Sequence, residues 1–181
     1  MGVIAVEPGT LYVTVAPAAR GKSTLVRDFP GTVLSTDDLR AQWCPTHPCH
    51  CTGQTRPDCD GGQSCRCQNP RVFAEIARRA TDALRAGQAV LIDATSLNPA
   101  ERRNHRESAT PAGAVSVALL AVALPLGELL RRNASRPRRV PSDVIESMAA
   151  QHAGLTVPDL LAEGFTRVVV WDDETRFRPG P

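Results

Sequence analysis

The residues from Ala16 to Thr24, APAARGKST, end in a pattern that binds the phosphates of nucleotides. In the motif G-x-x-x-x-G-K-[ST], the lysine reaches the β- and γ-phosphates and the next hydroxyl ligates Mg²⁺, while amides at a helix start cradle the anion. Gly21, Lys22, Ser23 and Thr24 supply the end of this motif. These four residues are therefore the predicted nucleotide-binding residues, with Ser23 as a magnesium ligand.

Further charged residues follow the other strands that the sequence predicts. Asp37, Asp38 and Arg40 stand in STDDLR, and Asp93 stands in LIDATSLNP. Ligands gather at the carboxyl ends of parallel strands, so these carboxylates are candidates for a base acting on a hydroxyl and for a partner of Mg²⁺. Residues 131–141, RRNASRPRRVP, hold five arginines within nine residues and predict a lid that neutralises a transferring phosphoryl group.

All six cysteines lie between residues 44 and 67, together with His47 and His50. In a reducing cytosol such density favours metal over disulfides, because thiolates and imidazoles are the ligands of tetrahedral zinc. The C-x-C pairs match no familiar zinc module, so the ligand set and the number of ions stay open, as do disulfides or a free-thiol loop. We predict an irregular, zinc-bound insertion whose candidate ligands are Cys44, Cys49, Cys51, Cys59, Cys65 and Cys67.

The elements that must position these residues alternate along the chain. The predicted strands are 11–16, 32–35, 89–94, 114–124 and 167–172. The predicted helices are 22–29, 70–87, 99–108, 126–136 and 141–154. Five strands alternating with helices predict a three-layer α/β/α fold with a parallel sheet, in which only the cysteine segment and the tail RFRPGP are irregular.

Length and charge place the chain among ordinary globular proteins. Its 181 residues suit a single domain, 1–181, and the net charge of +2 is too small to indicate a nucleic-acid partner by itself. The longest apolar stretch, 114–126, is too short to cross a bilayer, and the first residues show no basic region followed by an apolar run. We expect a cytoplasmic protein without a membrane partner, and the oligomeric state stays open.

Four blocks of the sequence resemble the kinase domain of phage polynucleotide 5′-kinase and related P-loop phosphotransferases. They are GKST, STDDLR, DATSLNPAERR and RRNASRPRRVPSDVIESM, in that order. The last two are the more specific blocks, and the likeness covers most of the chain apart from residues 44–67. The resemblance implies a P-loop NTPase fold and transfer of the γ-phosphoryl of ATP to a 5′-hydroxyl of DNA or RNA, with Mg²⁺ as a cofactor.

On the donor side, the resemblance implies that Lys22 contacts the β- and γ-phosphates and that Ser23 supports Mg²⁺. Arg132 and Arg136 are the implied lid residues on the donor phosphates. These roles agree with the physics of a loose transition state, which depends on positioning and charge neutralisation.

On the acceptor side, the resemblance implies that Asp37 is the general base and that Arg40 grips a phosphate of the acceptor. Asp93 is the implied strand-end carboxylate that shapes the site. The cysteine segment interrupts this side of the site between Arg40 and the next helix. We therefore expect residues 44–67 to lie over the acceptor pocket and to shape the choice of substrate.

The start of the predicted phosphate loop departs from this family. Ala16 and Ala19 stand where relatives have glycine, and Pro17 lacks an amide donor. If Ala19 must adopt a left-handed conformation, the strain is about 1–2 kcal/mol, which corresponds to about tenfold in affinity. We expect ATP binding to survive, and Arg20 is a candidate to compensate as an extra cation at the phosphates.

Other functions remain open. A P-loop kinase of the same build could act on a nucleoside, another small metabolite or a protein, because fold does not separate these acceptors. Only Tyr12, Trp43 and Phe73 are plausible stacking platforms, although Arg40, Arg102, Arg103 and Arg106 could line a basic groove. A third alternative is a non-catalytic, zinc-containing module that binds nucleic acid or a protein. Taken alone, Asp37 could also be a helix cap, and the arginine run an exposed basic face.

Overall fold

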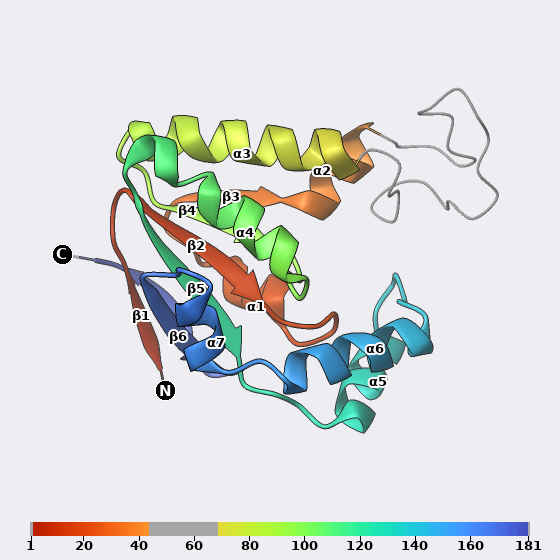
Figure 1. The fold of residues 1–181 in the computed structure, drawn as a ribbon. Coiled ribbons are helices and arrows are strands. Elements are labelled where there is room, and N and C mark those ends of the chain that lie inside the picture. The colour runs from red at the N-terminus through yellow and green to blue at the C-terminus, as the bar shows by residue number, and fades with distance from the viewer. Residues whose placement is uncertain (1, 44–68, 181) are drawn as a thin grey trace.

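Five parallel strands form the central sheet of the computed structural model, which describes residues 2–43 and 69–180. Their spatial order is β3-β4-β2-β5-β6 (Figure 1). In chain order they are β2 (Thr10–Val15), β3 (Thr32–Ser35), β4 (Val90–Asp93), β5 (Val115–Ala121) and β6 (Arg167–Trp171). Each strand overlaps a predicted one, so the expectation of a parallel α/β sheet is confirmed.

Helices connect the strands and pack around the sheet (Figure 1). They are α1 (Lys22–Val26), α2 (Thr36–Trp43), α3 (Asn69–Arg85), α4 (Pro99–Glu107), α5 (Leu126–Ala134), α6 (Ser142–Ala153) and α7 (Val157–Ala162), with a 3₁₀ turn, η2 (Thr110–Ala112). Neither α2 nor α7 was among the helices predicted from the sequence. Helix α7 begins with a capping box, in which each of Thr156 and Asp159 accepts a hydrogen bond on its side chain from the backbone N–H of the other.

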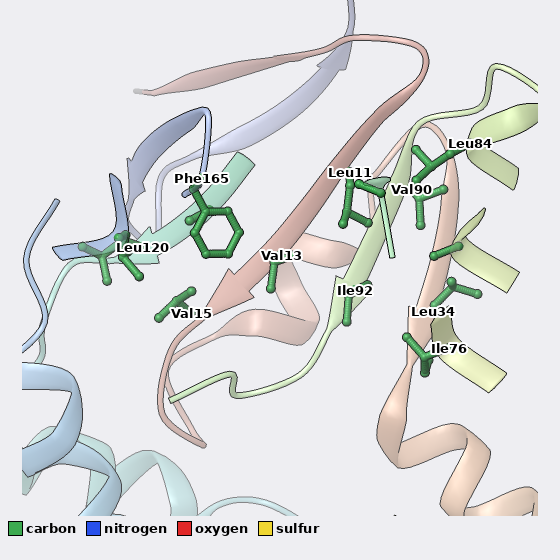
Figure 2. Close-up of a cluster of buried hydrophobic side chains, with 14 of the residues drawn as sticks. Leu11, Val13, Val15, Leu34, Ile76, Leu84, Val90, Ile92, Leu120 and Phe165 are labelled. Atoms are coloured by element: carbon green, nitrogen blue, oxygen red, sulfur yellow. The ribbon is translucent and has the colours of Figure 1, made fainter. Parts of the chain in front are cut away.

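The side chains of β2 alternate between the two faces of the sheet, as a fully buried strand requires. Leu11, Val13 and Val15 lie on one face, in a core that includes Ile76 and Leu84 of α3 (Figure 2). The four buried residues of α3, Val72, Ile76, Ala80 and Leu84, recur at helical spacing and belong to this core. Burial of this stripe fixes α3 along β3, β4 and β2.

The opposite face carries a second, two-stranded parallel sheet, β1 (Val3–Val6) and β7 (Arg176–Pro179), beside α1. The expectation that the tail RFRPGP is irregular is therefore wrong. Phe177 of β7 is buried and packs edge-on against Phe29 at 5.0 Å between ring centroids. The β1–β7 sheet thus takes the place of part of the helical layer that the sequence predicted on this face.

Helices α5 and α6 pack against each other beside the carboxyl ends of the strands (Figure 1). Leu129 of α5 and Ile145 of α6 form a small core with Ala18, which belongs to the β2–α1 loop. The arginine-rich segment 131–141 is therefore attached to that loop by apolar packing. In residues 2–43 and 69–180, no helix has the length and apolar character that crossing a membrane requires.

Candidate active site

The carboxyl edge of β2, β3 and β4 brings the predicted residues together. Ser35 ends β3 and is the register partner of Asp93, which ends β4. On its other side β4 pairs with β2, and β2 leads into residues 16–21, the β2–α1 loop. Because all three strands are parallel, Lys22 at the start of α1 and Asp37 in the first turn of α2 leave the sheet at the same edge as Asp93.

The β2–α1 loop contains two residues in the left-handed region. Ala19 has φ 62° and Gly21 has φ 107°. Ala19 therefore adopts the left-handed conformation considered in the sequence analysis. For a residue with a Cβ atom, this conformation costs about 1–2 kcal/mol. The N–H of Ala16 donates to the carbonyl of Thr95 at 3.0 Å, which ties the start of the loop to the segment after β4.

The ammonium of Lys22 is held inside this loop. Its Nζ donates to the carbonyl oxygens of Pro17 at 3.0 Å and Ala16 at 3.4 Å. Burial lowers the pKa of Lys22, and the charges of Asp93 and Asp37 oppose that shift. The three side chains therefore act on one another electrostatically, as expected for residues that share a site.

Asp93 ends β4 in a half-buried position. Burial raises its pKa, and the nearby charge of Lys22 opposes this effect. Thr14 fixes the backbone just beyond: its Oγ1 lies 2.6 Å from the carbonyl oxygen of Ala94 and accepts from the Ala94 N–H at 3.1 Å. Thr14 was not predicted as a site residue, because threonine is common in strands and only its complete burial in the central strand distinguishes it.

Asp37 lies between two arginines. Nη1 of Arg40 donates to its Oδ1 at 2.7 Å, and Nη1 of Arg138 lies 3.9 Å from its Oδ2. Arg40 is only 3% exposed and also donates to Asn69 Oδ1 at 2.9 Å and to Thr36 Oγ1 at 3.2 Å. These contacts orient Asp37 from within the fold, while the contact of Arg40 with an acceptor phosphate stays a prediction.

The predicted lid arginines lie near the β2–α1 loop. Arg132 donates to Glu128 at 2.6 Å and to Asp173 at 2.7 Å, and these hydrogen bonds raise its pKa. Arg136 is close enough to Lys22 for its charge to lower the pKa of that ammonium. The segment that carries Arg136 and Arg138 therefore faces both Lys22 and Asp37.

Arg20 differs from its expected role. The side chain is 1% exposed, its Nε donates to the carbonyl of Val122 at 2.6 Å, and its Nη1 donates to Asp173 at 2.6 Å. Its guanidinium carbon also lies 4.9 Å from the centroid of the Trp171 ring. Arg20 is thus an anchor of the loop rather than the additional phosphate cation that the sequence suggested.

A cavity of about 220 Å³ adjoins the loop. Its lining residues come from the loop, α1, α5 and the β6–β7 connection: Gly21, Thr24, Leu25, Arg132, Trp171, Asp172, Asp173, Thr175 and Arg176. Asp173 was not predicted as a site residue. Asp172 and Asp173 directly follow β6, as Asp93 ends β4. The rule that ligands bind at the carboxyl ends of parallel strands could therefore have predicted them from the sequence.

The oxygen donors at this edge suit Mg²⁺. Ser23 is exposed, and Asp37 and Asp93 provide carboxylates. In residues 2–43 and 69–180, no group of three or more His, Cys, Asp or Glu side chains could hold a metal ion. Mg²⁺ here would therefore take most of its ligands from phosphate and water, as this ion usually does.

The zinc prediction remains untested. The six cysteines from Cys44 to Cys67, with His47 and His50, lie outside the described residues. The expected position of residues 44–67 over the acceptor pocket is untested for the same reason.

Comparison with known proteins identifies related folds, although no curated protein matches the sequence. Kti12 from Chaetomium thermophilum, solved in complex with ADP-AlF3, is similar with a TM-score of 0.59 and 13% identity, over 91% of this chain and 90% of that chain. A gluconokinase from Sinorhizobium meliloti has a TM-score of 0.51 and 19% identity, over 93% of this chain and 85% of that chain. At these identities the likeness concerns the fold.

A family match covers most of the candidate site, apart from the cavity-lining residues 171–176. The AAA domain family matches residues 11–155, which run from β2 through the β2–α1 loop, Asp37, Asp93 and the arginine-rich segment to the end of α6. The chain therefore belongs to the AAA domain family, with the parallel sheet and the strand–loop–helix arrangement of a P-loop protein.

Proposed function

We propose that this protein is an ATP-dependent phosphotransferase that moves the γ-phosphoryl group of ATP to a hydroxyl acceptor. The observation that carries the proposal is the convergence of Lys22, Asp37 and Asp93, whose charges act on one another at the end of a P-loop. Membership of the AAA domain family supports nucleotide binding. Two proteins of similar fold add support, one described as a gluconokinase and one in complex with ADP-AlF3.

On the donor side, Lys22 binds the β- and γ-phosphates. Its half-buried ammonium already lies in the loop, where it donates to the carbonyl oxygens of Ala16 and Pro17. Phosphate oxygens of ATP would replace these neutral acceptors with charged ones. Arg132 and Arg136 approach the same phosphates from the lid. Mg²⁺, held by Ser23 and by phosphate oxygens, supplies charge neutralisation when it is bound.

On the acceptor side, Asp37 accepts the proton of the attacking hydroxyl. Arg40 occupies Oδ1 of Asp37 from the protein interior, which leaves Oδ2 on the side of Arg138 and the lid. In a loose transition state the proton moves late, so an ordinary carboxylate is a sufficient base if its position is fixed. Asp93 shapes the site beside Lys22.

We propose the 5′-hydroxyl of DNA or RNA as the acceptor. Support comes from the sequence blocks STDDLR, DATSLNPAERR and RRNASRPRRVPSDVIESM, which resemble polynucleotide 5′-kinases. Of the arginines that could line a nucleic-acid groove, Arg103 is exposed.

A small hydroxyl compound is the second candidate acceptor, and the burial of two arginines favours it. Arg102 is 1% exposed and donates to Glu163 and to the carbonyl oxygens of Ser96 and Leu97. Arg40 is 3% exposed and donates to Asp37 and Asn69. Both guanidinium groups are buried and hydrogen-bonded within the protein, so less basic surface is available to bind a polynucleotide backbone.

Transfer of labelled γ-phosphate from MgATP tests the proposal. The acceptors are 5′-hydroxyl DNA and RNA oligonucleotides, nucleosides, gluconate and other small hydroxyl compounds, and a protein mixture. Lys22→Ala and Asp37→Ala should each abolish transfer. Asp38→Ala is the matched control, because Asp38 is the exposed neighbour of Asp37 and should leave most of the activity.

The outcomes separate the candidate functions. Transfer to oligonucleotides that depends on Lys22 and Asp37 supports a polynucleotide kinase, whereas transfer to a small compound alone assigns a metabolite kinase. If the chain neither binds nor turns over MgATP, phosphotransfer is excluded and a non-catalytic binding module remains.

A further inference from the structure

Arg20 stands between the two left-handed residues of the β2–α1 loop, Ala19 and Gly21. Glycine adopts this conformation at no steric cost, whereas alanine does not. A loop with alanine at φ 62° will relax unless other contacts hold it. The contacts that hold Ala19 must therefore come from its neighbours.

Arg20 makes such contacts on the far side of the loop. Nε donates to Val122 O just beyond β5, and Nη1 donates to Asp173 just beyond β6, each at 2.6 Å. The guanidinium also stacks over Trp171, the last residue of β6. Arg20 itself is 1% exposed, although the side chain of Asp173 is half exposed, and these hydrogen bonds fix the backbone that bears Arg20.

We propose that Arg20 is a positioning residue that holds Ala19 in its left-handed conformation before ATP arrives. The contacts of Arg20 then offset the strain at Ala19 when the protein folds. The loop already has its binding conformation when ATP binds, so ATP binding does not have to supply the free energy that orders it. Arg20 acts through the backbone and does not touch the phosphates. This inference rests on the proposed function, namely that residues 16–21 bind the phosphates of ATP.

A double-mutant cycle between Ala19 and Arg20 tests the proposal, with the Kd for MgATP measured by calorimetry. In the parent the loop is already held, so Ala19→Gly should change the Kd less than it does when Arg20 is replaced. Arg20→Met retains the aliphatic bulk and removes the hydrogen bonds of the guanidinium. ATP binding must then supply the free energy that returns Ala19 to its left-handed conformation. We expect its Kd to rise about tenfold, equivalent to about 1.4 kcal/mol.

Rescue is the decisive part of the cycle. Adding Ala19→Gly to Arg20→Met removes the strain that the lost anchor had offset, so the Kd should return to within about threefold of the parent. Arg27→Met is the control: Arg27 is exposed just after α1 and carries the same charge, and its loss should change the Kd by less than about twofold.

Two results would overturn the inference. One is an unchanged Kd for Arg20→Met, and the other is a double variant as weak as Arg20→Met alone, which would mean that Arg20 acts by its charge. Circular dichroism checks that each variant folds, and Arg20→Lys replaces Arg20→Met if that variant does not. Failure of the parent chain to bind MgATP would instead overturn the proposed function, and this inference with it.

Discussion

Arg40 donates to Oδ1 of Asp37 at 2.7 Å, while Oδ2 of the same carboxylate lies 3.9 Å from Nη1 of Arg138. The two oxygens of Asp37 thus have different surroundings. One is fixed from the interior by a buried arginine, which Asn69 of α3 holds in turn. The other faces the arginine-rich segment, where an acceptor hydroxyl could replace the longer contact.

Arg40→Lys tests whether this arrangement positions the base. Lysine keeps the charge but has a single nitrogen, whereas Arg40 uses Nε for Asn69 and Nη1 for Thr36 and Asp37. We expect kcat to fall about 10–100-fold, because a carboxylate misplaced by about 1 Å loses much of its effect. The Kd for MgATP should not change, since the donor site lies on β2 and α1. Arg85→Lys, at the exposed end of α3, is the matched control, and a weaker Kd with normal kcat would contradict the assignment.

His105 gives the protein a predictable response to acid. It is 2% exposed and packs edge-on against Phe73, and burial lowers its pKa from 6.5 to about 4. Between these values the unfolded chain binds a proton that the folded chain does not, so stability falls as the pH drops from 6.5 towards 4. The full effect is about 3 kcal/mol. Urea unfolding across this range should show a smaller loss for His105→Leu, and parallel curves for the two proteins would refute the assignment.

Arg102 should be a major contributor to stability. Its guanidinium is 1% exposed, pairs with Glu163 after α7, and holds the carbonyl oxygens of Ser96 and Leu97 after β4. Arg102→Ala leaves these acceptors without a donor and should lower the free energy of unfolding by about 3–5 kcal/mol. Its exposed neighbour provides the control: Arg103→Ala should cost less than about 0.5 kcal/mol in the same denaturant titration. Equal losses for the two variants would show that the buried contacts contribute little.

The cysteine segment predicts a measurable metal content. We expect the purified chain to contain at least one Zn²⁺, bound by some of the cysteines between residues 44 and 67. Chelation should lower the melting temperature and change the preference among acceptors, because residues 44–67 are expected to lie over the acceptor pocket. Elemental analysis and transfer assays before and after chelation measure both effects. A chain without zinc, or one whose stability and acceptor preference survive chelation, would count against this prediction.

Much of the site follows from local sequence. Lys22, Asp37 and Asp93 each stand just after an apolar, β-branched run, and parallel strands bring such residues to one edge whatever their order in the sheet. The five strands of the central sheet could be predicted because each coincides with a short apolar, β-branched run. Ala19 was also marked by the family resemblance, because relatives have glycine at this position and glycine adopts a positive φ without steric cost.

Features that depend on distant partners could not be predicted in this way. Arg40 and Arg102 occur in polar helices, and the sequence suggests that they are exposed. Both are buried in the structure, where Arg40 pairs with Asn69, 29 residues away, and Arg102 pairs with Glu163, 61 residues away. β7 offers only R-F-R as an alternating pattern and becomes a strand because β1 lies beside it. Arg20 was misassigned because its partners, Val122 and Asp173, lie more than 100 residues further along the chain.

The pairing of β1 with β7 also bears on how the protein emerges from the ribosome. Phe177 completes an aromatic cluster with Tyr12 and Phe29, residues that are synthesised about 150 residues earlier. Until Phe177 leaves the exit tunnel, one side of β2 has no cover from β7, and Tyr12 and Phe29 lack this aromatic partner. The face that binds α3 is complete sooner, so co-translational folding should proceed one side of the sheet at a time, with the aromatic side last.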